Sequence, residues 1–67
     1  MEIVLTITSG QNTSLGLAEQ IALKLQAAGT IKSFGPDAAT RGLYVICSSQ
    51  MKKFVSLQFA NEGYEII

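Results

Sequence analysis

The side chains that most often carry out acid–base and nucleophilic chemistry are scarce in this chain. Its 67 residues include no histidine, five scattered acidic residues and a single cysteine, Cys47. Without histidine, the Ser-His and Cys-His pairs that activate a nucleophile cannot form. Cys47 lies in the most apolar stretch, where burial raises a thiol pKa and makes the group inert. We therefore expect a non-enzymatic protein with no catalytic residues, no metal site and no cofactor.

A polar loop, residues 9–14 (SGQNTS), is the first candidate binding site, because it lies between an expected strand and an expected helix. Free backbone amides and the positive end of the helix dipole can hold an anion there, near Gln11, Asn12, Thr13 and Ser14. The loop matches neither the P-loop nor the dinucleotide-binding pattern. Ordinary helix capping explains the same residues and is the interpretation we favour. A small-ligand or anion-binding module is the alternative function.

Lys52, Lys53 and Phe54 form a second candidate, in which two cations beside an aromatic ring contact nucleic acid. Equal numbers of basic and acidic residues give a formal net charge of zero. That balance argues against a protein whose main partner is a phosphate backbone. Two lysines also protect a strand from edge-to-edge aggregation. Nucleic-acid binding is therefore the third and least favoured function.

The element that must organise these residues is a helix over residues 14–29, SLGLAEQIALKLQAAG. Apolar residues recur there at three- and four-residue steps, which places them on one helical face. This face consists of Leu17, Ala18, Ile21, Ala22, Leu25 and Ala28. The opposite face is polar except for Leu23 and Ala27, which we expect to contact another protein. Gly29 fits the left-handed position that ends a helix.

Residues 1–8 alternate in the way that is typical of a strand. Ile3, Leu5 and Ile7 share one side, and we expect them to face the helix. Because this segment leads directly into the helix, we place it inside the sheet and not at an edge.

Three further segments are predicted to be strands. Residues 30–34 follow the helix and run parallel to the first strand, although the two need not be neighbours. Gly-Pro-Asp at the start of residues 35–42 predicts a loop. Residues 43–48, LYVICS, are nearly continuous in apolar side chains, as in a central strand. Residues 64–67 form the last strand.

The segment over residues 50–62 fits two structures. Alternation in residues 54–59, FVSLQF, and the turn-like residues 60–63 predict a strand followed by a hairpin. A helix ended by Gly63 is the competing structure. Its shared face would consist of Met51, Phe54, Val55, Gln58 and Phe59. The β-propensity of the segment favours the strand.

The predicted fold class is α+β, with a single amphipathic helix packed on a four- to five-stranded mixed sheet. The predicted order of elements is β-α-β-β-β-β, and β-α-β-β-α-β is the alternative. The whole chain, residues 1–67, forms one small domain.

One helix covers one face of such a sheet, which leaves an apolar face that needs a partner. The side chains expected on that face are Val4, Tyr44, Ile46 and Phe54. Ile66 and Ile67 end the chain on an apolar edge, which we expect to pair with a second copy in a homodimer.

The expected function is therefore that of a small binding protein acting through protein–protein contacts, as an inhibitor or an adaptor. Inhibitors that bacteriophages make against host defence systems are one group of small, single-domain proteins without catalytic residues. The expected contact residues are Leu23, Ala27, Tyr44, Phe54, Ile66 and Ile67.

The sequence carries no apolar run long enough to span a bilayer. Glu2 and the absence of an early basic region are not typical of a signal peptide. Together with the unpaired Cys47, these features predict a cytoplasmic protein that does not bind membranes.

Overall fold

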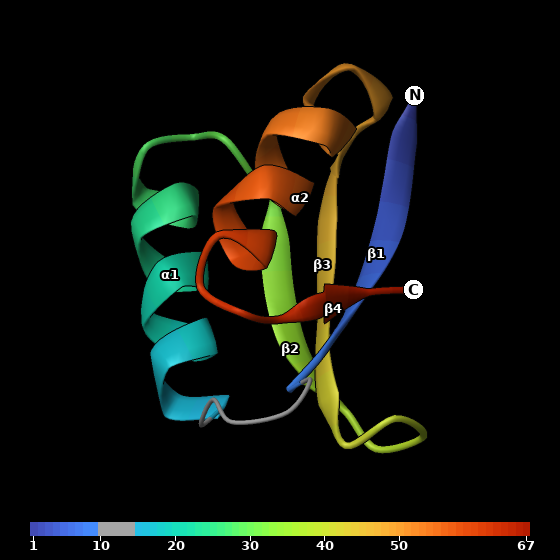
Figure 1. Cartoon of the computed structure of the whole chain (residues 1–67). Coiled ribbons are helices and arrows are strands. Elements are labelled where there is room, and N and C mark those ends of the chain that lie inside the picture. The colour runs from blue at the N-terminus through green and yellow to red at the C-terminus, as the bar shows by residue number, and fades with distance from the viewer. Residues whose placement is uncertain (10–14) are drawn as a thin grey trace.

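A computed structural model describes residues 1–9 and 15–67 (Figure 1). The elements, in chain order, are β1 (Glu2–Thr8), α1 (Leu15–Ala27), β2 (Ser33–Asp37), β3 (Gly42–Ser48), the 3₁₀ turn η1 (Ser49–Met51), α2 (Lys52–Ala60) and β4 (Glu65–Ile66). The fold class is α+β, as predicted, and the order of the main elements is that of the alternative, β-α-β-β-α-β.

The four strands form one sheet in the order β2-β3-β1-β4. Every neighbouring pair is antiparallel, so the prediction of a mixed sheet is wrong. β1 and β2 both run antiparallel to β3, which lies between them, and they are therefore parallel to each other without touching. β1 has a neighbour on each side, which confirms its predicted place inside the sheet.

The core lies between one face of the sheet and both helices (Figure 1). Alternate residues of β1 and β3 face the helices as three opposed pairs: Ile3–Cys47, Leu5–Val45 and Ile7–Leu43. These side chains are buried except Ile3, which is half-buried. Since no polar or charged residue of the described part is buried, the core is held by apolar packing.

Residues 52–60 form α2, and the favoured strand over 54–59 is wrong. Val55 and Phe59 lie one turn apart on the helix and are fully buried against the sheet. A second helix covers the part of the sheet that α1 does not reach. Local β-propensity is weak compared with the burial of two large side chains, so packing decides the structure of this segment.

Both helices end in the same hydrogen-bonded motif around a glycine. At the end of α1, Gly29 has a φ of 80°, and the Thr30 amide donates to the Leu25 carbonyl at 2.8 Å. After α2, Gly63 has a φ of 89°, and the Tyr64 amide donates to the Phe59 carbonyl at 3.2 Å. This is the Schellman motif, in which glycine takes the left-handed position without a steric penalty. The predicted role of Gly29 is confirmed.

The second strand is displaced toward the C-terminus relative to its predicted position. The Gly-Pro-Asp tripeptide lies inside β2, and the turn occupies residues 38–41. Pro36 is tolerated there because β2 is an edge strand, where a missing amide donor costs no ladder bond. Asp37 holds the turn, since its carboxylate accepts hydrogen bonds from the Thr40 hydroxyl at 2.9 Å and the Ala39 amide at 3.3 Å.

α1 packs on the sheet with a narrower face than predicted. Ala18, Ala22 and Leu25 are buried, whereas Ile21 is half-buried and Leu17 is exposed. Ala28, also predicted in the core, is exposed. The two alanines let the helix axis approach the sheet closely. The larger side chains beside them then point along the surface toward α2.

Gly42 gives the first test of this architecture. A Cβ at this position would lie 1.9 Å from the Ile7 carbonyl oxygen, a backbone atom that cannot move alone. We expect Gly42→Ala to lower the free energy of unfolding by about 1–3 kcal/mol, as for other overpacked sites. Gly16→Ala, on the exposed surface of α1, is the matched control and should be neutral or stabilising. Equal stability of the two variants in urea denaturation would contradict the close approach of β3 to β1.

Cys47 gives a second test. Its side chain is 1% exposed, and burial raises the pKa of the thiol, so less reactive thiolate is present at any given pH. We expect a disulfide-exchange reagent to label the folded protein slowly at pH 8, faster as the pH rises, and completely in denaturant. Rapid labelling without denaturant would show that β3 is not covered by the helices.

Candidate functional site

The exposed large apolar side chains are concentrated on the helices. Among the described residues, Leu17 is 39% exposed, Leu23 56%, Phe54 47% and Leu57 50%. By contrast, the sheet face away from the helices has one such residue, Val4. The helical layer is therefore the surface best suited to an apolar contact.

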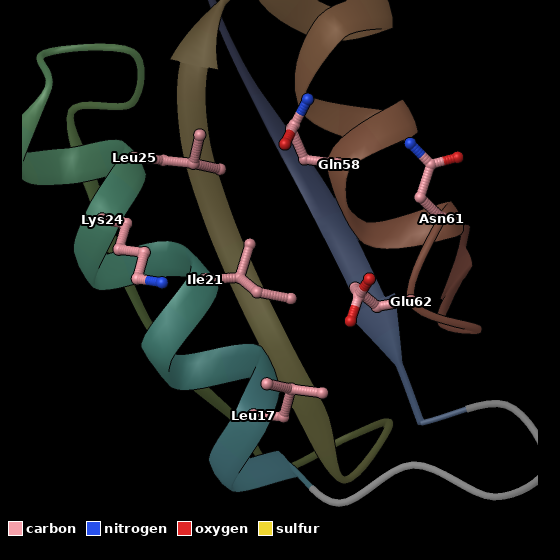
Figure 2. A pocket seen from close by; sticks show the side chains of 7 residues that line it. All are labelled: Leu17, Ile21, Lys24, Leu25, Gln58, Asn61 and Glu62. Atoms are coloured by element: carbon pink, nitrogen blue, oxygen red, sulfur yellow. The ribbon is translucent and has the colours of Figure 1, made fainter.

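A groove of about 380 Å³ separates α1 from α2 (Figure 2). Its lining residues are Leu17, Ile21, Lys24 and Leu25 on one wall and Gln58, Asn61 and Glu62 on the other. The first wall is mainly apolar, and the second carries two amides and a carboxylate. The groove is open to solvent and not an enclosed cavity.

Helical periodicity explains why these residues form the walls. Leu17, Ile21 and Lys24 are four and three residues apart, so they form one stripe beside the buried face of α1. Gln58 and Asn61 form the matching stripe on α2 and the turn after it. Phe54, one turn before Gln58, lies on the same side of α2 but outside the residues that line the groove.

The two walls carry opposite charges. Figure 2 shows Lys24 on the α1 side of the groove and Glu62 on the α2 side. Both residues are exposed. Within residues 1–9 and 15–67, the ion pair is Lys32–Glu2, with 3.1 Å between Nζ and Oε2, and neither groove charge takes part in one. The charges of the groove are thus free to meet those of a ligand.

The other face of the sheet has a small apolar centre. Val4 and Ile46 are cross-strand partners there, next to Tyr44, which confirms the predicted face for these three residues. Phe54 is not on this face, contrary to prediction, because it belongs to α2. A Cβ on Gly35 would lie 2.7 Å from the Tyr44 ring, so the ring covers the backbone of edge strand β2. The Tyr44 ring is therefore already packed against a neighbouring strand of the same sheet.

The predicted edge at the end of the chain is short. β4 has two residues and pairs with β1, where Ile66 lies opposite Ile7 and packs against the core. Ile67 is 75% exposed, and its amide donates to the Thr6 carbonyl at 2.8 Å. The hairpin predicted between residues 54–59 and this strand does not form. Homodimer formation through β4 stays a prediction.

The remaining predicted site residues do not converge. Leu23 and Ala27 are exposed on α1, as predicted, on the side of the helix away from the groove. Lys52 and Lys53 are exposed at the start of α2. The anion site proposed for Gln11, Asn12, Thr13 and Ser14 lies outside the described residues. In the described part of the chain, no three His, Cys, Asp or Glu side chains gather closely enough to hold a metal ion.

Sequence reasoning missed the groove because one of its walls depends on α2. The available signal was the alternative helical face in residues 50–62, which would have placed Gln58 beside α1.

The described helices include none that is both long and apolar enough to cross a membrane.

The contact between Tyr44 and Gly35 can be tested by a double-mutant cycle. Gly35→Ala should destabilise the protein because the new methyl group displaces the Tyr44 ring. In a Tyr44→Ala background the same change should cost less, with a coupling free energy of about 0.5–3 kcal/mol. Additive effects in urea denaturation would mean that the ring does not rest on Gly35.

Comparisons of this chain with models of known protein families, with curated proteins and with solved structures found no significant match.

Proposed function

We propose that this protein is a non-enzymatic binding domain that presents its helical layer to another protein. The observation that carries this proposal is the groove between α1 and α2, which has an apolar wall and lies among exposed apolar side chains. An apolar centre surrounded by polar groups is the usual anatomy of a protein–protein contact.

The shape of the groove favours a macromolecule over a small molecule. Pockets for small ligands enclose most of the ligand surface and are largely lined with apolar groups. This groove is open, and one of its walls consists of Gln58, Asn61 and Glu62. A ligand held only by the groove would leave much of its own surface in water. A protein would in addition cover Phe54 and Leu57, which are about half-exposed.

The uncovered sheet face is a weaker candidate for the main contact. An antiparallel sheet can leave one face in water when that face is largely polar. Around Val4 and Ile46 the same face carries Thr6, Ser33 and Ser48. Edge pairing is also limited, because β4 has two residues and Pro36 removes an amide donor from β2.

The biological role that follows is that of an inhibitor or an adaptor, which acts by occupying a surface of its partner. Such a role needs no reacting side chains, only a stable fold that presents its contact residues in a fixed arrangement.

Two variants of the same helix test the proposal. Leu17→Glu places a charge in the groove, and Leu23→Glu places the same charge on the other side of α1. Both leucines are exposed, so both variants should fold, which thermal denaturation followed by circular dichroism would verify. The tagged protein and each variant are used to capture partners from cells that express the chain, after nuclease treatment, and captured proteins are identified by mass spectrometry.

We expect wild type and Leu23→Glu to capture the same partner and Leu17→Glu to bind it at least tenfold more weakly, a loss of about 1.4 kcal/mol or more. Loss of capture only with Leu23→Glu would place the contact around Leu23 and Ala27 and would contradict the proposal that the groove is the binding surface. If wild type captured no protein reproducibly, or only through nucleic acid, the proposed function would be wrong.

A further inference from the structure

The two charges of the groove limit what can bind in it. Lys24 and Glu62 stand on opposite walls, are exposed, and make no ion pair in the described structure. An occupant that carried one sign of charge would be attracted to one wall and repelled by the other. The complementary occupant carries an acidic group on its side toward α1 and a basic group on its side toward α2.

The shape of the groove indicates an elongated occupant. α1 and α2 run in opposite directions (Figure 1), and the side chains that line the groove stand on facing sides of α1 and of the end of α2 (Figure 2). On α1 the wall extends over nine residues, from Leu17 to Leu25, which spans about 12 Å at the rise of an α-helix. That length matches about two turns of a third helix. Side chains of such a helix pack into the furrow between two helices as ridges into grooves.

We propose that the groove receives an amphipathic helix of a partner protein, with an apolar stripe on Leu17 and Ile21, an acidic flank beside Lys24 and a basic flank beside Glu62. This inference rests on the proposed function. The flanking charges select the orientation of the bound helix, in the way that charges beside the seam of a coiled coil select orientation and partner. The side-chain amides of Gln58 and Asn61 provide further hydrogen bonds to its polar flank.

The experiment uses displayed helical peptides as the probe, each with a fixed leucine stripe and with Glu, Lys or Gln at the flanking positions. Binders are selected against the full chain and against the double variant Lys24→Glu/Glu62→Lys. The matched control is Glu2→Lys/Lys32→Glu, which exchanges the two charges of the ion pair outside the groove. Chemical-shift mapping with one selected peptide verifies that it occupies the groove.

We expect wild type and the control to select peptides with one acidic and one basic flank over peptides whose two flanks carry the same sign of charge by roughly tenfold. The double variant should select the same class of peptide but bind it in the reverse orientation, which a spin label at one end of the peptide would report. Selected peptides without a flank preference, no selected helical peptide, or shifts outside the groove would each overturn the inference. A concentration-dependent dimer that Leu17→Glu dissociates would also overturn it, because the occupant would then be a second copy.

The two proposals fail separately. If Leu17→Glu abolishes capture of the cellular partner while no flank preference is found, the binding function stands and the charged helix is wrong. If Leu17→Glu leaves capture unchanged, the groove is not the contact and both proposals fall.

Discussion

The structure depends on the pairing of β1 with β3. Six successive residues of each strand are paired, and this register places Ile3, Leu5 and Ile7 on the same face as Leu43, Val45 and Cys47. A shift by one residue would move them into water, so the pattern specifies the register strongly. A 67-residue chain has one small core, and the face formed by Leu5, Ile7 and Val45 is its centre. Every other element either covers this face or brings the chain back to it.

The two helices cover this face with different side chains. α1 uses Leu25 and the small Ala18 and Ala22, which bring its backbone near the sheet, whereas α2 uses the larger Val55 and Phe59. Each helix ends at a left-handed glycine that turns the chain back to the sheet. After α2 this return is strengthened by Tyr64, whose ring meets that of Phe59 edge to face at 6.2 Å between centroids. The short β4 is thereby positioned beside β1 although it has two residues.

The groove results from the different ways in which α1 and α2 pack on the sheet. Because α1 packs through its alanines, Leu17 and Ile21 are left on its flank with no partner on α2 of similar character. The facing wall is polar, so the two helices do not close on each other as they would in a helical bundle. The apolar part of the binding surface we propose thus lies at the margin of the core, where Leu17 is exposed and Ile21 is half-buried. Their exposure has a cost in water that a partner would relieve.

Much of the structure could be predicted from local patterns. Alternation in β1 predicted its buried face, and its direct connection to the helix predicted its place inside the sheet. Periodicity together with Gly29 predicted α1 and its end. The sequence by itself determined these elements because each has one period and a clear end signal. Residues 54–59 satisfy the period of a strand and that of a helix equally. Their structure was decided by tertiary packing, because a second helix buries the part of the apolar sheet face that α1 does not reach. The composition of Gly35-Pro36-Asp37 is typical of a turn, but the structure places these residues in edge strand β2, where proline is tolerated. The groove required both helices to be placed, because a cleft is formed by residues that are far apart in sequence and become neighbours only when the core is packed.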